Sequence, residues 1–539
     1  MCQEVCYCRM GFITYIKHEM GYKLKIGVIS PNDPREWVRA VNTEMMLKHE
    51  TLLINVLRVH GYEVVRGGEG LPANEQLAWN TGLVIKHVKN VAKHKPDVLI
   101  LNQGSWTFPY DSVDAVKLFE KETGDIARVV IFSHKETKVP GLVAGMAVGG
   151  ALKRLGIPYV LCYGDIEHDG EAINRLFKIL EFHEQRVRAA PKVKEVTSQL
   201  PYQKYLAFGG MALKMATATT DVDLWQKVFG VSYDNLGQSV LKDRALGMVK
   251  WYDKPGTGRF EIIDDRVQEA FNMIHGKGVG KVELGQPEVL NLNKLVYQIS
   301  LYYAAYDIIA EHNATFAGIK CQDELSANEC TACIATAYLN NDVDPAGHDK
   351  LIIPTACEND MDSALTQLIL YMMSGKPVGF GDFRDISNGT LIIMNCGQHP
   401  PYYFGTTDEA PLAKLARVEY MPQEIFYRAG GAAVRGRTPG GELITVARLA
   451  RENLRYVLVA TVVETIEVDP DEHERYNYAW PMIKGKLFIP EDTMIDMWPC
   501  NHLAFTYGDY TAHLVEFAHR LDIGFKVFDR NGLEYTKPS

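Results

Sequence analysis

The chain has 539 residues, of which 47% are hydrophobic and 23% charged, so its composition suits a globular enzyme and its length suits about three domains. Its 57 basic and 67 acidic residues give a net charge of −10, which argues against a nucleic-acid binder, since such a protein needs a basic face. No apolar run reaches the roughly 18 residues that span a bilayer, so a membrane partner is not expected either.

The first part of the chain and the cysteines bear on its location. Residues 1–22 hold three cysteines within the first eight positions and lack a signal-peptide core and cleavage site. We interpret them as an N-terminal extension, with Met20 as a candidate natural start. Ten cysteines without zinc-site spacing predict a reduced, cytoplasmic protein. Cys330-Thr331-Ala332-Cys333 has the form of a redox motif, although it opens an apolar run in which buried thiols are common.

Residues 23–190 predict an α/β domain with a doubly wound parallel sheet. Apolar strands alternate with helices, the pattern of a sheet covered on both faces. A flavodoxin-like order is expected, with pockets at the carboxyl ends of the strands, and no G-x-G-x-x-G follows the first strand to indicate a dinucleotide site. The strands are expected at Leu24–Ser30, Tyr62–Arg66, Asp97–Gln103, Ala127–Ser133 and Pro158–Asp165, and the helices at Glu36–His60, Gln76–Lys95, Asp111–Glu122, Leu142–Leu155 and Gly170–Arg188.

The polar, proline-containing stretch Ala189–Gln199 is predicted to be a linker. Beyond it, residues 191–374 predict a second flavodoxin-like or Rossmann-like α/β domain. A long amphipathic helix is expected at Asn291–Asn313 and a strand at Thr315–Lys320.

Residues 375–539 predict a β-rich C-terminal domain with a barrel-like or sandwich core, because strand-like runs there alternate with Gly- and Pro-rich turns. The expected strands are Thr390–Asn395, Val418–Met421, Leu443–Ala447, Tyr456–Val463 and Lys486–Ile489, followed by a helix at Tyr510–Leu521 and a strand at Gly524–Phe528.

Three side chains next to apolar runs are candidates for chemistry. Glu358 follows an apolar strand and precedes a helix, Asp382 ends another strand, and His502 precedes a third apolar run. Two carboxylates and an imidazole form a typical ligand set for a divalent metal that keeps positions open for substrate.

Each candidate also has a structural interpretation. Glu358 or Asp360 would cap the following helix, a contribution of about 1 kcal/mol. Asp385 is an alternative candidate to Asp382. The two carboxylates would lie in a solvated loop, or one would form an ion pair with Arg384 between them. His502 would be a buried structural histidine. The roles of Asp385 and His399 stay open.

Several motifs, in order from Lys23 to the C-terminus, resemble the L-fucose isomerase family. They are Phe208-Gly209-Gly210, Trp225-Gln226 with Phe229-Gly230-Val231, Ala356-Cys357-Glu358, Gly381-Asp382-Phe383-Arg384 and Asn501-His502. The resemblance implies that Glu358, Asp382 and His502 bind Mn²⁺ or another divalent cation. It also implies that Glu358 and Asp382 are the catalytic acid–base groups of an aldose–ketose isomerase acting on L-fucose, D-arabinose or a related sugar through an enediol.

The same resemblance implies further contacts with the monosaccharide. Gln322 and Asn501 match positions that hydrogen-bond sugar hydroxyls, Arg35 lies near the pocket, and Trp106 offers an aromatic face to the sugar of a neighbouring subunit in a hexamer. The stretch from Asp382 to His502 is shorter than is usual in the family, which leaves the exact sugar open.

Two other interpretations remain. A sugar-binding or regulatory relative without catalysis would keep the architecture, but retention of all three expected ligands argues against it. A metal-dependent hydrolase would use the same donors, but no H-E-x-x-H motif supports it.

Overall fold

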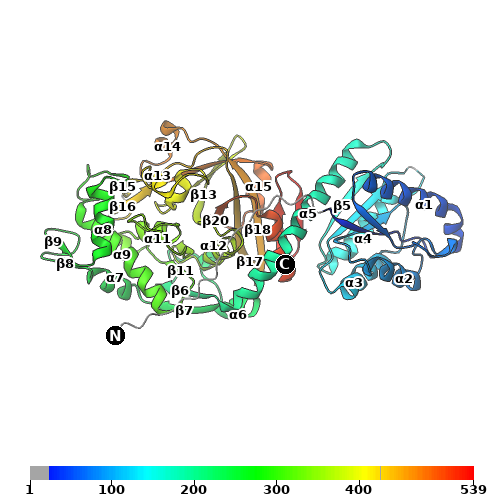
Figure 1. The fold of residues 1–539 in the computed structure, drawn as a ribbon, viewed down its shortest axis with the longest axis horizontal. Coiled ribbons are helices and arrows are strands. Elements are labelled where there is room, and N and C mark those ends of the chain that lie inside the picture. Colours follow the sequence, from blue (N-terminus) through cyan, green and yellow to red (C-terminus); the bar gives the residue numbers. More distant parts are fainter. Residues whose placement is uncertain (1–22, 137, 425) are drawn as a thin grey trace.

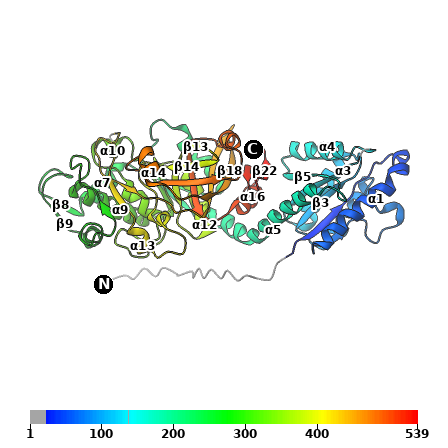
Figure 2. The ribbon, with the colours of Figure 1, turned by 90° about the horizontal axis from the view of Figure 1, so that it is seen from above.

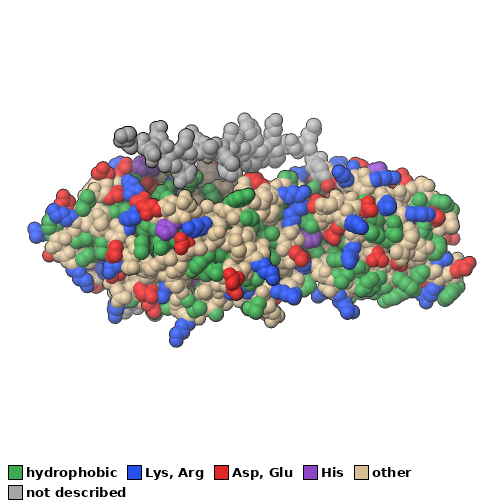
Figure 3. Space-filling model, turned by 90° about the horizontal axis from the view of Figure 1, so that it is seen from below, with side chains coloured by type: hydrophobic (Ala, Val, Ile, Leu, Met, Phe, Trp, Pro, Cys, Tyr) green, Lys and Arg blue, Asp and Glu red, His purple; other side chains and the backbone are tan. Residues whose placement is uncertain are grey.

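The computed structural model describes residues 23–136, 138–424 and 426–539, so the expected N-terminal extension, residues 1–22, lies outside the described residues. The molecule is elongated, with an α/β unit at one end and the remainder of the chain at the other (Figure 1). Acidic and basic side chains are spread along the whole length of the face in Figure 3. Within the described ranges, no helix is both long and apolar enough to span a membrane.

The N-terminal unit is a five-stranded parallel sheet in the order β2-β1-β3-β4-β5, which confirms the predicted flavodoxin-like order. Every residue of β3 and β4 is buried, as expected for strands covered on both faces. The strands are β1 (Lys25–Ile29), β2 (Glu63–Arg66), β3 (Val98–Gln103), β4 (Val129–His134) and β5 (Tyr159–Gly164); the helices are α1 (Glu36–Val59), α2 (Thr81–Ala92), α3 (Pro109–Thr123) and α4 (Gly141–Arg154).

The helix α5 (Gly170–Gln199) joins the two halves of the molecule, as two perpendicular views show (Figures 1 and 2). The predicted linker at Ala189–Gln199 is therefore wrong, because this stretch forms the last turns of α5. Pro191 inside the helix removes one backbone hydrogen bond, at a cost of about 3 kcal/mol. Burial of Ala190, Val193 and Val196 on the same stretch offsets that cost.

A buried ion network holds α5 to both halves. Glu516 on α16 (Thr511–Arg520) lies 2.5 Å from Arg128, which directly precedes β4, and 3.1 Å from Arg186 of α5. Arg520 adds a third cation at 2.7 Å. These contacts join the first sheet, α5 and the C-terminal part of the chain through one carboxylate.

The second sheet is parallel and four-stranded, in the order β12-β11-β6-β7, which confirms a second α/β region. The predicted strand at Thr315–Lys320 and helix at Asn291–Asn313 correspond to β11 and α9. The strands are β6 (Lys204–Phe208), β7 (Ser232–Leu236), β11 (Phe316–Ile319) and β12 (Thr355–Cys357); the helices are α6 (Val222–Phe229), α7 (Gln238–Leu246), α8 (Asp265–Phe271), α9 (Leu292–Glu311), α10 (Glu324–Asn328), α11 (Cys333–Leu339) and α12 (Met361–Ser374).

The C-terminal part is a closed barrel, in agreement with the barrel-like alternative. Six strands follow the order β17-β20-β13-β14-β19-β18, and pairing of β17 with β18 closes the ring. They are β13 (Gly379–Ser387), β14 (Thr390–Met394), β17 (Leu443–Glu452), β18 (Arg455–Thr465), β19 (Met482–Leu487) and β20 (His502–Tyr507), and β21 (Gly524–Phe528) and β22 (Glu534–Lys537) extend the sheet from β18.

Smaller elements lie outside the barrel. The predicted strand at Val418–Met421 is not part of it, because β15 (Glu419–Pro422) pairs with β10 (Lys281–Val282) and β16 (Ala432–Arg435) in a separate sheet. The remaining elements are the hairpin β8 (Val249–Trp251) and β9 (Phe260–Ile262) and the helices α13 (Pro411–Leu415), α14 (Pro470–Tyr476) and α15 (Glu491–Met497).

The helix α12 connects the second sheet to the barrel and packs against β11, β12, β17 and β20. Only residues 358–360 separate it from β12, so the carboxyl edge of the parallel sheet meets one end of the barrel there. The limits predicted for the three domains stay a prediction, although the limit at residue 190 falls inside α5.

Candidate active site

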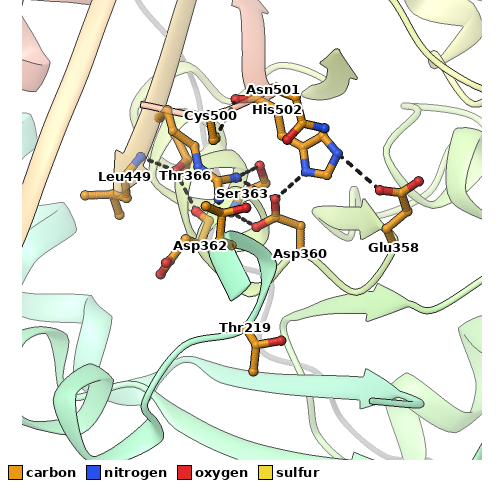
Figure 4. Close-up of polar contacts among 12 residues, drawn as sticks. Thr219, Glu358, Asp360, Asp362, Ser363, Thr366, Leu449, Cys500, Asn501 and His502 are labelled. Atoms are coloured by element: carbon orange, nitrogen blue, oxygen red, sulfur yellow. Dashed lines mark hydrogen bonds and ion pairs between the residues drawn. The ribbon is translucent and has the colours of Figure 1, made fainter. Parts of the chain in front are cut away.

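Glu358 lies in a tight turn between β12 and α12. It has a φ of +57° and the next residue, Asn359, has a φ of +51°, a left-handed conformation that costs a glutamate about 1–2 kcal/mol. Asn359 holds the turn: its side-chain oxygen accepts from the Tyr205 hydroxyl at 2.6 Å, and its amide donates to the carbonyls of Gly209 and Gly210. The turn thereby directs the Glu358 carboxylate away from the sheet edge toward the barrel (Figure 4).

Asp382 and His502 come from neighbouring barrel strands. β13 and β20 run antiparallel, and their register sets Asp382 directly opposite His502. The Nε2 atom of His502 lies 3.1 Å from a carboxylate oxygen of Glu358 and 3.5 Å from one of Asp382. The structure therefore brings the three residues of the expected ligand set together, although they are far apart in the sequence.

The other ring nitrogen of His502 is held by Asp360. Its Nδ1 lies 2.7 Å from Asp360 Oδ2, and the imidazole is 1% exposed (Figure 4). A carboxylate at Nδ1 fixes the ring and directs Nε2 toward Glu358 and Asp382. Burial alone would lower the pKa of His502, but its hydrogen bonds to Asp360 and Glu358 outweigh burial and raise it to about 10.

Arg448 on β17 neutralises Asp360. Its guanidinium lies 2.7 Å from Asp360 Oδ2, bonds Ser363, and donates to the carbonyl oxygen of Thr217 at 2.8 Å. Burial opposes ionisation of Asp360, yet the charges of Arg448 and His502 hold its pKa well below the usual range. The Asp360 side chain also accepts from the Ser363 amide at 2.9 Å, so it caps α12 as one interpretation of the sequence predicted.

Asp382 has the opposite electrostatic environment. Burial of the site and the nearby Glu358 carboxylate raise its pKa to about 7, although the charge of His502 acts against them. Its side chain keeps 36% of its surface exposed, so it lies at the open side of the cluster. A carboxyl group with a pKa near neutrality is suited to exchanging protons with a bound molecule.

Two amides flank these carboxylates. Gln322, in the loop after β11, donates to Glu358 at 2.9 Å and to the Tyr427 hydroxyl at 3.4 Å. Asn501, directly before β20, donates to Asp382 at 3.3 Å. Both residues therefore lie beside the expected ligand set, and their contact with a sugar stays a prediction.

Arg35 and Trp106 are not at this site within one chain. Arg35 directly precedes α1 and forms an ion pair with Asp33 at 2.6 Å, whereas Trp106 lies between β3 and α3. Figures 1 and 2 show α1 and α3 on the other side of α5 from α12, β13 and β20. A contribution from Arg35 and Trp106 to the site stays a prediction that requires a second copy of the chain.

The residue types are suited to a divalent cation, which would take the place of the proton on His502 Nε2. Bonds of about 2.1 Å set neighbouring ligand atoms about 3 Å apart, close to the two distances measured from His502 Nε2. With Asp360 neutralised by Arg448, the carboxylates of Glu358 and Asp382 offer negative charge to such an ion. Among the described residues, no three His, Cys, Asp or Glu side chains are arranged to hold a metal ion without movement.

Asp385 and His399 lie outside this cluster. Asp385 accepts from the Tyr476 hydroxyl at 2.5 Å, next to a bulge in β13. His399 is fully buried beside Phe505, with no hydrogen-bond partner for either ring nitrogen among the described residues, and burial lowers its pKa to about 3.

Sequence reasoning missed Arg448 and Tyr427. The signal for Arg448 is an arginine inside the apolar run of β17, in which all residues from Ile444 to Leu449 are buried. A fully buried cation needs an anion, so that pattern predicts a partner without identifying it. Tyr427 lies in a loop and carries no comparable signal.

Family models and relatives were compared with the chain. The model described as "L-fucose isomerase, first N-terminal domain" matches residues 23–194, and that described as "L-fucose isomerase, C-terminal domain" matches residues 393–528. Together they match more than half of the chain.

Curated relatives are similar over most of their length. The L-fucose isomerase of Phocaeicola vulgatus is 21% identical over 461 residues, 73% of this chain and 76% of the relative. That of Streptococcus pneumoniae (strain JJA) is 22% identical and that of Vibrio vulnificus 21%, each covering 73% of this chain and 75% of the relative. A solute-binding protein from Agrobacterium vitis, solved with bound allitol, is 11% identical over 60% of this chain and 81% of its own, and its TM-score of 0.15 is too low to indicate a shared fold.

Proposed function

The chain belongs to the L-fucose isomerase family, and on this basis we propose that it is a divalent-cation-dependent aldose–ketose isomerase acting on L-fucose, D-arabinose or a related sugar. The observation that carries the proposal is the convergence of Glu358 and Asp382 on the Nε2 atom of His502. The chemistry needs a base and an acid on a shared substrate, and these two carboxyl groups come from different elements at one open site.

Glu358, Asp382 and His502 would hold the cation, with Mn²⁺ as the expected ion because the donor set is rich in oxygen. Such an ion would act as a Lewis acid and would stabilise negative charge that develops on the substrate. Asp360 would act through His502 by keeping its Nδ1 engaged and its Nε2 directed to the site.

The two carboxyl groups would move the protons. One removes the proton from C2 of the open-chain aldose while O1 takes up a proton, which gives the enediol. A proton then leaves O2 and one is delivered to C1, which gives the ketose. Either carboxyl group can take up a proton and return it, and Gln322 holds Glu358 in place through its amide.

A test measures ketose formation from L-fucose, D-arabinose and other aldopentoses, with EDTA and then with added Mn²⁺. We expect activity that EDTA abolishes and Mn²⁺ restores. Glu358→Gln should lower kcat by about 10²-fold or more because it removes an acid–base group. Glu324→Gln is the matched control, since Glu324 pairs with Lys320 on the surface. Hydrolysis products instead of a ketose, or turnover unaffected by Glu358→Gln, would contradict the proposal.

We also propose that the functional unit is an oligomer, with a hexamer expected, in which Arg35 and Trp106 of one copy complete the site of another. Large exposed apolar side chains on α1, α3 and α4 support a contact there: Trp37 (71% exposed), Val41 (82%), Tyr110 (67%) and Met146 (61%). Light scattering tests the assembly. Glu358→Gln and Trp106→Ala proteins should each be inactive alone. A mixture of the two, dissociated and reassembled, should regain some activity, because some sites would then combine Glu358 from one copy with Trp106 from the other.

A further inference from the structure

Four cysteines gather directly behind the candidate site. Each is buried, and none of them is in a disulfide. They come from four different segments: Cys321 follows β11, Cys333 begins α11, Cys357 is the last residue of β12 and Cys396 follows β14. The cluster adjoins the site because Cys357 immediately precedes Glu358 in the chain.

Within the cluster, one pair of sulfur atoms faces each other. The Sγ atoms of Cys357 and Cys396 are 3.9 Å apart. The other two thiols have different partners, since Cys333 donates to the Cys396 carbonyl at 3.2 Å and Cys321 accepts from the Ala332 amide at 3.4 Å. Gln423 lies beside the pair and donates to the same Cys396 carbonyl at 2.6 Å, which holds the segment after β14 in position.

A disulfide bond is about 2.05 Å long, so the two sulfurs need to approach by about 2 Å. Rotation of the cysteine side chains would supply part of such a movement, and a shift at the ends of β12 and β14 would supply the remainder. The end of β12 carries the strained turn that contains Glu358, so any shift there is transmitted to the site.

We propose that Cys357 and Cys396 form a reversible oxidation site, which hydrogen peroxide converts to a disulfide. The sulfur of Cys396, the more exposed of the two, attacks one peroxide oxygen, the O–O bond breaks, and the thiol proton leaves with the departing hydroxide as water. The sulfur of Cys357 then attacks the resulting sulfenic sulfur, the S–O bond breaks, and a second water forms. Two electrons pass from the sulfurs to the peroxide, and a dithiol reverses the reaction.

The disulfide would switch off the candidate active site by displacing Glu358. A displacement of about 1 Å at a catalytic group can cost about 10²-fold in rate. This consequence rests on the proposed isomerase function, whereas formation of the disulfide does not.

The experiment treats the full-length protein with hydrogen peroxide and follows two readouts. Peptide mapping under non-reducing conditions should recover a Cys357–Cys396 cross-linked peptide, and isomerase activity should fall by about 10²-fold, as expected for a displaced carboxylate. Dithiothreitol should remove the cross-link and restore the activity. Cys396→Ala and Cys357→Ser should each abolish the cross-link and keep their starting activity in peroxide. Cys330→Ala is the matched control, because Cys330 is also buried but contacts the carbonyls of Lys294 and Gly430.

The readouts separate the possible failures. Absence of the cross-linked peptide, or oxidation confined to the partly exposed Cys500, overturns the proposal. If the cross-link forms and turnover is unchanged, the proposed inactivation by displacement of Glu358 is wrong. A protein that forms the cross-link but isomerises no sugar in either state supports the oxidation site and contradicts the proposed function. Circular dichroism of the cysteine variants establishes that they fold.

Discussion

At the scale of single residues, Asp360 shows what the sequence predicts and what it does not. The position of Asp360 before an apolar helix predicts a cap, and the structure has that cap. The same carboxylate also holds His502 and Arg448, which lie 142 and 88 residues further along the chain. Those partners could not be predicted, because pairing of buried charges depends on which strands become neighbours in three dimensions.

Replacement of Asp360 by asparagine tests its positioning role. The amide leaves Arg448 buried without its anion, so we expect a loss of about 3–5 kcal/mol in the free energy of unfolding. Without the carboxylate at Nδ1, His502 loses its fixed orientation, and the affinity of the proposed metal site for Mn²⁺ should fall by about 10–100-fold. Chemical denaturation and metal titration measure the two effects separately.

The matched control for this variant is Asp264→Asn. Asp264 also caps a helix, α8, and also pairs with an arginine, Arg266, but on an exposed surface. It should lose about 1 kcal/mol or less, with metal affinity unchanged. Equal losses of metal affinity in the two variants would mean that Asp360 has no particular role in orienting His502.

At the scale of elements, the strands and helices of the two α/β regions were largely predictable, because continuous apolar runs alternate with helical periodicity. The junction at α5 was not. Polar composition and Pro191 indicate a break, yet α5 continues because its buried face packs against α16. Tertiary packing overrides a local helix breaker here, and that packing is invisible in a short window of sequence.

The strand β13 offers a second prediction at this scale. A Cβ at Gly381 would lie 2.4 Å from a methyl group of Ile393, so the neighbouring strand β14 leaves no room for a side chain. Gly381→Val should lower the free energy of unfolding by about 1–3 kcal/mol through overpacking. It should also lower activity, because the next residue, Asp382, keeps its place opposite His502 only while β13 keeps its position.

Thermal denaturation and the isomerase assay check this prediction, with Gly150→Ala as the control. Gly150 lies in α4 with open space where a Cβ would stand, so alanine should stabilise the protein by about 0.5–1 kcal/mol. A Gly381→Val protein with normal stability and activity would show that β13 adjusts more freely than its packing indicates.

At the scale of the whole molecule, alternation of elements predicted the order of the first sheet, but closure of the barrel between β17 and β18 could not be deduced from strand content alone. The contact of the two halves through Glu516 was also unpredictable. Glu516 is buried between Arg128 and Arg186, and although burial opposes its ionisation, these cations lower its pKa below the ordinary value of 4.5.

The Glu516 network predicts a pH-dependent stability. Because the pKa is lower in the folded than in the unfolded state, the stabilisation is complete above pH 4.5 and is lost as the pH falls through the folded pKa. At pH 7, Glu516→Gln should be less stable than the wild type by about 3–5 kcal/mol, since it leaves buried arginines unpaired. The difference should shrink below pH 4.5. Urea denaturation from pH 7 to pH 3 measures it, and a constant difference would contradict the assignment.

The pairing of β13 with β20 has a consequence for biosynthesis. Asp382 leaves the ribosome 120 residues before His502, and β20 must insert between β13 and β17 before the two side chains can meet. A nascent chain that ends after α12 already has the strands of its first sheet and Glu358, but it lacks both Asp382 and His502. The candidate site is therefore complete only after β20 takes its place between β13 and β17.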